Sequence, residues 1–185
     1  MTATWVVLGI IALIAIWAIT LYNSLIRAKN TVDESWSDID TELKRRYELI
    51  PNLIETVKGY AAHEKTTLNA VIEARNKAMT PHNTLDAQAK DENILTGTLK
   101  QLFALGESYP NLKANENFLQ LQEQLSNTED RIQAARRFYN ANVRDLNNKI
   151  EIVPSNVIAN LYNFKQREFF ELEDVAMREV PKVQF

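Results

Sequence analysis

Cysteine is absent from this 185-residue chain, and residues that favour turns are scarce. Without cysteine the chain forms no disulfide, thiolate metal site, iron–sulfur cluster or thiol nucleophile. Four glycines and five prolines are too few for the many tight turns of a β-sandwich or β-barrel. A formal charge of −3 also argues against a surface built to bind nucleic acid. The composition therefore favours a helical protein without thiol chemistry.

Residues that support metal or nucleophilic catalysis are also few. Only two histidines occur. His63 and Glu64 begin like a zinc-protease helix, but Thr67 occupies the position that such a helix reserves for its second histidine. Tyr60 stands where a di-iron bundle would have glutamate, three residues before the histidine. The glycines lie too far apart for a phosphate-binding loop. We therefore expect no enzymatic activity, cofactor or metal site.

The most apolar stretch of the chain covers residues 5–22 and has the uncharged sequence WVVLGIIALIAIWAITLY. Its eighteen residues make a helix of ~27 Å, close to the ~30 Å hydrocarbon core of a bilayer. Trp5 and Tyr22 stand at its ends, where amphipathic rings favour the membrane interface. It lacks the basic start and cleavage site of a signal peptide, and the polar face that would mark a soluble core helix. We predict one transmembrane helix, preceded by a short flank at residues 1–4.

The orientation of this helix depends on few charges. Arg27 and Lys29 follow the span, whereas only the α-amino group precedes it. The positive-inside rule then places the rest of the chain in the cytoplasm. We predict a single-pass protein of the inner membrane with a cytoplasmic bulk, a periplasmic or extracellular bulk being the alternative. The predicted interface residues are Trp5, Tyr22, Arg27 and Lys29.

Beyond residue 30, apolar residues recur at alternating steps of three and four, as in helices packed along a narrow seam. One run covers residues 31–79, a second covers 118–150, and a shorter helix is expected at 84–106. Helices with a single apolar stripe need partners to be stable. We therefore predict an all-α protein whose residues 23–170 form an antiparallel bundle of three long helices.

Proline and capping residues mark the expected helix ends. Residues 80–83 (TPHN) should end the first long helix, and Thr84 should cap the second. Residues 153–156 (VPSN) should end the third. Ser155 or Asn156 should then cap a short fourth helix.

Pro51 falls inside the first long run. The apolar seam passes through it without losing phase, which favours a kink; a true break, giving four long helices, is the alternative. Residues 171–185 mix charged and apolar residues without a helical period, and we expect an extended tail.

Four polar residues lie on or beside the seam, namely Arg46, Glu64, Thr128 and Asn142. Buried polar groups cost stability but specify register and partner number, so we interpret these residues as structural.

Residues 134–140 (AARRFYN) are dense in basic and aromatic side chains. Tyr139 falls on the seam and is expected to pack inward. The C-terminal residue, Phe185, is apolar, which suits capture of its free carboxylate by a partner, docking of the tail on its own bundle being the alternative. The candidate partner surface consists of Arg136, Arg137, Phe138 and Asn140 on the helix, with Val183 and Phe185 in the tail.

Two segments, LKRRYELIPNL at residues 43–53 and AARRFYN at 134–140, are specific in combination. Shorter matching segments are YN at 22–23, RAKN at 27–30, VKGY at 57–60, HE at 63–64, YPNLK at 109–113, TE at 128–129, PSN at 154–156 and PKVQF at 181–185. Together they resemble the LemA family over almost the whole chain. The resemblance implies a bacterial membrane protein with one N-terminal span and an antiparallel helical bundle. It implies no agreed enzymatic activity and no catalytic residue.

These features support two functional hypotheses. In the first, the chain is a non-catalytic, membrane-anchored scaffold that forms homo-oligomers or presents its bundle to other membrane proteins. Confinement of the partners to the bilayer raises their effective concentration and so favours such contacts. In the second, it is an adaptor in envelope stress or signalling that binds a protein partner, such as a membrane protease, through its C-terminal tail. The expected partners are the lipid bilayer, further copies of the chain and a membrane protein, but not nucleic acid.

The predicted topology has a direct test in spheroplasts. Added protease should leave the chain beyond residue 22 intact in sealed spheroplasts and digest it after permeabilisation, because the bulk is predicted to be cytoplasmic. Immunoblotting measures both states, with a periplasmic protein as the control. Digestion in sealed spheroplasts would assign the bulk to the opposite side.

Overall fold

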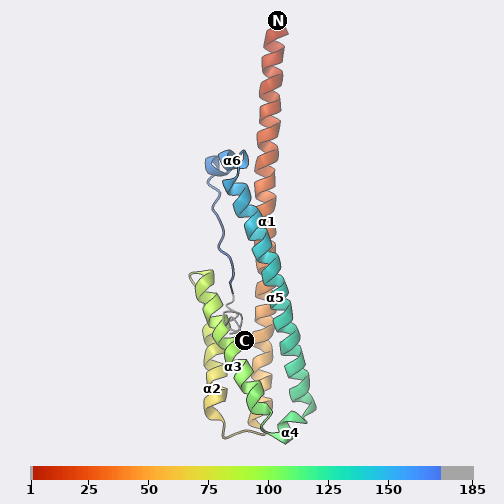
Figure 1. The fold of residues 1–185 in the computed structure, drawn as a ribbon, viewed down its shortest axis with the longest axis vertical. Coiled ribbons are helices and arrows are strands. Elements are labelled where there is room, and N and C mark those ends of the chain that lie inside the picture. The colour runs from red at the N-terminus through yellow and green to blue at the C-terminus, as the bar shows by residue number, and fades with distance from the viewer. Residues whose placement is uncertain (1, 172–185) are drawn as a thin grey trace, which may run out of the picture. The chain divides into compact units, whose positions relative to one another are not determined.

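The computed structural model describes residues 2–171. These residues form the helices α1 (Thr2–Lys58), α2 (Lys65–Ala78), α3 (Leu85–Gly106), α4 (Pro110–Lys113), α5 (Glu116–Glu151) and α6 (Ser155–Leu161) (Figure 1). No strand occurs within this part of the chain, and the all-α prediction is confirmed. The described residues divide into two compact units. Unit 1 contains residues 2–39 and 135–169, and unit 2 contains residues 40–134 with 170 and 171.

Unit 1 combines the first part of α1 with the end of α5 and with α6. Leu25 is fully buried and clusters with Ile158 and Ala159 of α6. The partly buried side chains packed against this cluster are Ala18, Leu21, Tyr22, Ile150 and Phe164. This cluster holds α6 beside the stretch of α1 that begins at Ala18.

The chain reverses after α6 through a left-handed residue. Asn163 has a φ of 57°, and the Phe164 amide donates a 2.9 Å hydrogen bond to the Ala159 carbonyl, as in a Schellman helix end. The following segment then returns along α5. The Asn147 side chain fixes it there, because its amide donates to the Arg167 carbonyl and its oxygen accepts from the Arg167 amide, both at 2.9 Å.

Unit 2 consists of residues 40–58 of α1, the helices α2, α3 and α4, and residues 116–134 of α5. The four longer segments alternate in direction (Figure 1), which is the arrangement expected of an antiparallel bundle. Its core contains apolar residues that the sequence pattern identified, including Leu43, Ile50, Ile54, Leu68, Leu95, Leu102, Phe118 and Ile132. The sequence pattern therefore located the buried face of each segment.

The helix expected over residues 31–79 is instead two helices, which corrects the bundle of three long helices. α1 ends at Lys58 and α2 begins at Lys65. The Tyr60 and Ala61 amides both donate to the Val57 carbonyl, at 3.0 and 2.8 Å. The last turn therefore includes a 3₁₀-type hydrogen bond, and the α-helix ends there. Gly59 lies at this point, and glycine costs about 1 kcal/mol relative to alanine inside a helix. The seam itself has a seven-residue gap from Ala61 to Leu68, a signal of the turn.

The other expected helix ends are confirmed, with one correction. α1 continues through Pro51, so the alternative of a break there is wrong. Thr84 caps α3, its side chain accepting a 3.2 Å hydrogen bond from the Ala87 amide. Neither Ser155 nor Asn156 caps α6, because Pro154 occupies the N-cap position and the Ser155 hydroxyl donates to the Ile152 carbonyl.

Two glycines of α3 form a matched pair for a stability test. A Cβ at Gly106 would lie 2.6 Å from Cζ of the buried Phe118, whereas a Cβ at Gly97 would meet no atom within 4 Å. Gly106→Ala should lower the free energy of unfolding by about 1–3 kcal/mol through overpacking. Gly97→Ala should raise it by up to about 1 kcal/mol, because alanine loses less entropy in a helix. Thermal unfolding of the full chain in detergent, followed by circular dichroism, measures both; equal effects would contradict this packing.

Candidate functional site

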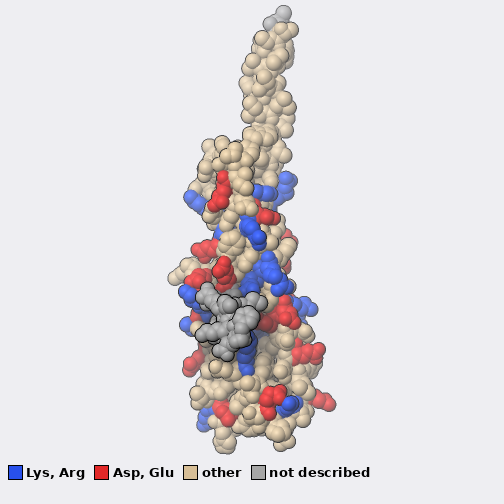
Figure 2. Space-filling model, in the orientation of Figure 1, with Lys and Arg blue, Asp and Glu red and all other residues tan. Residues whose placement is uncertain are grey.

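The first part of α1 is an apolar helix without protein cover. Residues 2–17 are all exposed. Among the helices of residues 2–171, α1 alone is long and apolar enough to cross a membrane. Figure 2 shows no charged side chain on this N-terminal segment, and the first one in the sequence is Arg27. Burial of apolar surface is the main force that stabilises proteins in water. The segment is therefore a candidate membrane span, in agreement with the prediction for residues 5–22.

The predicted interface residues lie at both ends of this segment. Trp5 is exposed near the N-terminus, and Arg27 and Lys29 are exposed beyond the span. Tyr22 is partly buried, since its ring lies 4.7 Å from that of Tyr162 and 6.0 Å from that of Phe164, between centroids. Tyr22 thus contributes to a cluster of aromatic rings where the span enters unit 1.

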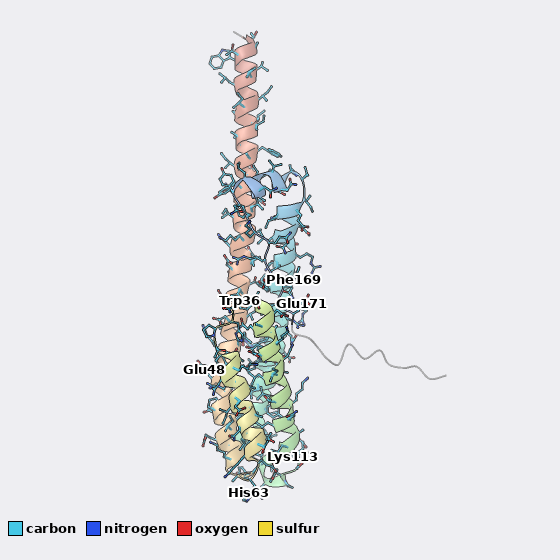
Figure 3. All side chains as sticks on the ribbon, turned by 90° about the vertical axis from the view of Figure 1, so that its left-hand side faces the viewer. Trp36, Glu48, His63, Lys113, Phe169 and Glu171 are labelled. Atoms are coloured by element: carbon cyan, nitrogen blue, oxygen red, sulfur yellow. The ribbon has the colours of Figure 1, made fainter. Side chains whose placement is uncertain are left out.

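The helical part of the predicted partner surface divides between two faces of α5. Arg137 and Phe138 are exposed, and Phe138 is 55% exposed. Arg136 and Asn140 are half-buried and take part in interactions. Tyr139 is buried, as expected, and its ring lies 5.5 Å from that of Trp36, which Figure 3 labels.

The Tyr139 hydroxyl fixes this face of α5. It donates a 3.0 Å hydrogen bond to the carbonyl of Glu168 in the returning segment. Burial raises the pKa of Tyr139, so the hydroxyl stays protonated as a donor. With Tyr139 held inward, Arg137 and Phe138 necessarily point outward. Val183 and Phe185, the tail residues of the predicted surface, lie outside the described residues.

The centre of unit 2 holds a buried ion-pair network that connects three helices. Arg46 of α1 is 1% exposed and contacts Glu92 of α3, which is fully buried. Its Nη1 lies 2.7 Å from Glu129 Oε2 of α5 and 3.1 Å from Thr96 Oγ1 of α3. Tyr47 donates to the second carboxylate oxygen of Glu92. The network therefore ties α1, α3 and α5 into one register.

Charge balance explains the protonation of this network. One guanidinium, that of Arg46, faces two carboxyl groups, those of Glu92 and Glu129. Burial raises the pKa of Glu92 above its ordinary value, and the Glu129 charge raises it further, although Arg46 opposes both. Burial and the Glu92 charge also raise the pKa of Tyr47. Glu92 and Tyr47 therefore each release their proton at a higher pH than an exposed group of the same type would.

A second charge cluster lies nearby on α3 and is less enclosed. Asp91 contacts Lys77 Nζ through one carboxylate oxygen and His82 Nε2 through the other, each at 2.9 Å. The hydrogen bond from Lys77 lowers the pKa of Asp91, and His82 contributes in the same direction. His63, the histidine singled out in the sequence, is exposed, and Figure 3 shows it at the same end of unit 2 as Lys113.

The sequence interpretation found one half of the buried network. Arg46 and Thr128 were placed on the seam, and both are buried. Thr128 bonds only its own helix, through the Gln124 carbonyl at 2.8 Å. Glu92, the partner of Arg46, was missed. It stands midway between the buried Ala89 and Leu95 at helical spacing, so an acidic residue at a core position was the available signal.

The charged residues of these two clusters form pairs that connect helices of unit 2. No group of three or more His, Asp or Glu residues suited to a metal ion occurs within residues 2–171. The Lys44-Arg45-Arg46 run does not form a basic patch, because Lys44 pairs with Asp40 at 2.6 Å while Arg46 is buried. What this arrangement does chemically is hold helices in register, since breaking a buried ion pair is strongly destabilising.

The raised pKa of Glu92 gives a pH-dependent stability with a defined sign. Above the ordinary glutamate pKa the folded state keeps a proton that the unfolded state releases, so the contribution of Glu92 falls as pH rises through its raised pKa. Glu92→Gln should remove this fall, which has a limiting slope of about 1.4 kcal/mol per pH unit. Denaturant unfolding of the wild type and the variant over a range of pH measures the free energy of unfolding and therefore this slope.

Asp91→Asn is the matched control with the opposite sign. Because the pKa of Asp91 is lowered, its contribution is present above the ordinary aspartate pKa and is lost as pH falls through the lowered value. The same change of slope in both variants would contradict the assignment.

Comparisons with known proteins identify the family of this chain. The family model described as LemA family matches residues 35–185. Protein LemA of Metamycoplasma hominis is 30% identical over 159 residues, which cover 83% of this chain and 71% of that protein. Magnetosome proteins MamQ 1 and MamQ 2 of Paramagnetospirillum magneticum are each 24% identical over 190 aligned positions, covering 89% of this chain and 70% of each relative. The chain belongs to the LemA family.

Proposed function

We propose that this protein is a non-catalytic scaffold, anchored in the inner membrane by residues 5–22, that self-assembles through its helical part. The bulk of the chain is cytoplasmic in this proposal. The observation that carries it is the exposed, uncharged start of α1, residues 2–17, which requires lipid or another apolar helix as cover.

The continuity of α1 supports the role of an anchor. The helix runs from Thr2 to Lys58 without interruption, so no flexible linker separates the span from the residues that follow it. Anchoring confines neighbouring copies to one plane, which raises their effective concentration without any new contact. Weak surfaces on the helical part are then sufficient for assembly.

The outward face of α5 supports a protein contact. Exposed Phe138 beside exposed Arg137 combines the two residue types, aromatic and arginine, that are enriched where protein interfaces derive their affinity. Because Tyr139 is held inward by Trp36 and by the Glu168 carbonyl, the position of this pair on the helix is defined. The buried location of the Arg46 network favours a structural role over catalysis, which supports the non-catalytic part of the proposal.

Crosslinking between copies tests self-assembly. Since the chain has no native cysteine, single cysteines in place of Arg137 or Phe138 report contacts without background. In isolated native membranes treated with copper phenanthroline and oxygen as the oxidant, each should give a disulfide-linked dimer. The double variant Arg137→Glu/Phe138→Ser should convert the oligomer expected in mild detergent to monomer, as measured by size-exclusion chromatography with light scattering.

Gln120→Cys and Lys100→Glu are the matched controls, because both residues are exposed in unit 2. The first should not crosslink, and the second should leave the oligomer intact. Monomers at micromolar concentration, with and without lipid, would contradict self-assembly. Deletion of residues 181–185 distinguishes the adaptor hypothesis from the scaffold hypothesis. The adaptor hypothesis predicts that the deletion abolishes binding of a partner while the oligomer persists.

A further inference from the structure

We propose that the end of unit 1 next to the span is a binding site for an anionic phospholipid. In this site α6 lies in the headgroup layer with its outer apolar face toward the acyl chains, and the pocket beside it takes the lipid phosphate. The inference rests on the membrane anchor of the proposed function but not on self-assembly.

The outer face of α6 exposes apolar side chains, with the polar Asn160 among them. Ile158 and Ala159 face the α1 cluster, whereas Val157 is 63% and Leu161 73% exposed. Val157 and Leu161 are four residues apart and therefore lie on one side of the helix. Ile152, Val153 and Tyr162 at the two ends of α6 are also exposed. Exposed apolar side chains on the side of a helix that faces away from its own core favour a second apolar environment.

The position of α6 identifies that environment as lipid. Its inner face packs against residues that include Ala18, Leu21 and Tyr22, which are the last residues of the predicted span at 5–22. The uncovered face of α6 is thus continuous with the apolar, uncovered surface of α1. Interfacial helices bury such a face about 5–10 Å into the boundary between headgroups and acyl chains.

A pocket of about 420 Å³ opens beside this helix, within the range of about 300–1,000 Å³ typical of ligand sites. Tyr22, Ile26, Leu146, Tyr162 and Phe164 provide its apolar and aromatic wall, and Lys29, Lys165 and Arg167 provide its charge. An apolar wall with basic side chains suits a group that is part hydrocarbon and part phosphate.

The charge around the pocket has one sign. No acidic residue occurs in residues 1–32 or 152–167, whereas both segments carry basic ones. Two carboxylates that flank these segments are already engaged: Asp33 pairs with Arg167 at 2.6 Å, and Glu151 accepts from Gln166. Lys29 and Lys165 have no carboxylate within 4 Å among the described residues, which leaves two ammonium groups for a phosphate.

The reach of Lys29 fits the headgroup layer. It lies seven residues beyond Tyr22, or ~10 Å along the helix. Helical side chains incline toward the N-terminus of their helix, which here is the direction of the span. A lysine stem pointing that way brings its ammonium group back toward the interface. Cytoplasmic leaflets carry anionic lipids, which matches the predicted orientation.

Lipid selectivity of the full chain tests the site. Wild-type protein in nanodiscs of mixed phosphatidylglycerol and phosphatidylcholine should retain phosphatidylglycerol preferentially, as measured by native mass spectrometry. Lys29→Gln/Lys165→Gln should lower this preference roughly tenfold or more without changing the circular dichroism spectrum. Lys65→Gln/Lys100→Gln, which removes two exposed lysines of unit 2, is the control and should retain it.

Equal retention of both lipids by the wild type, or an equal loss in the control variant, would overturn the proposal. Inorganic phosphate serves as the competitor: if it displaces phosphatidylglycerol at millimolar concentration, the pocket is a site for free phosphate and not for a lipid. Self-assembly is read separately, because crosslinks at residues 137 and 138 should persist in the Lys29/Lys165 variant.

Spin labels measure the depth of α6 independently. Labels on Val157→Cys and Leu161→Cys should be accessible to oxygen and shielded from a water-soluble nickel reagent in phosphatidylglycerol vesicles. A label on Gln120→Cys, exposed in unit 2, should show the opposite pattern. Nickel accessibility at 157 and 161 equal to that at 120 would place α6 in water and overturn the proposal.

Discussion

The removal of apolar surface from water is the constraint on which this structure depends, and α1 meets it in two ways. Along residues 2–17 no part of the described chain covers the helix, and this stretch is the candidate membrane span. From Ala18 onward, protein side chains take over, with Leu25 fully buried against α6. Further along, Leu43, Ile50 and Leu53 are buried in the core of unit 2. A single helix is thus uncovered over its candidate span and covered by protein side chains over the rest of its length.

Unit 2 adds polar specificity to this apolar burial. Hydrophobic seams with steps of three and four tolerate shifts of one helix along another, whereas a buried ion pair does not. Arg46 has its carboxylate partners, Glu92 and Glu129, on α3 and α5. Tyr47 connects Glu92 to α2, because its hydroxyl contacts the Glu92 carboxyl group and lies 3.3 Å from the Ala78 carbonyl. The cost of burying these charges is offset by mutual pairing, and a unique register results.

Local patterns in the sequence predicted the features that depend on neighbouring residues. The Thr84 cap, the inward position of Tyr139 and the end of α5 before Pro154 follow from spacing and residue type, and the structure confirms them. The turn after Lys58 was missed because the apolar positions on both sides keep helical steps, and only Gly59 and the gap before Leu68 mark it. A periodicity indicates that a segment is helical, but it does not show where the helix reverses.

The sequence by itself determined the candidate membrane span, the helical class and the family, since each depends on composition or on residues within a few turns of each other. Tertiary structure decided which residues meet: Glu92 with Arg46, Arg167 with Asp33, and Lys165 with Lys29 at one pocket. Glu92 and Arg46 are 46 residues apart in the sequence, and Arg167 and Asp33 are 134 residues apart. No local spacing encodes such a contact, because it exists only after the helices have packed and excluded water from between them.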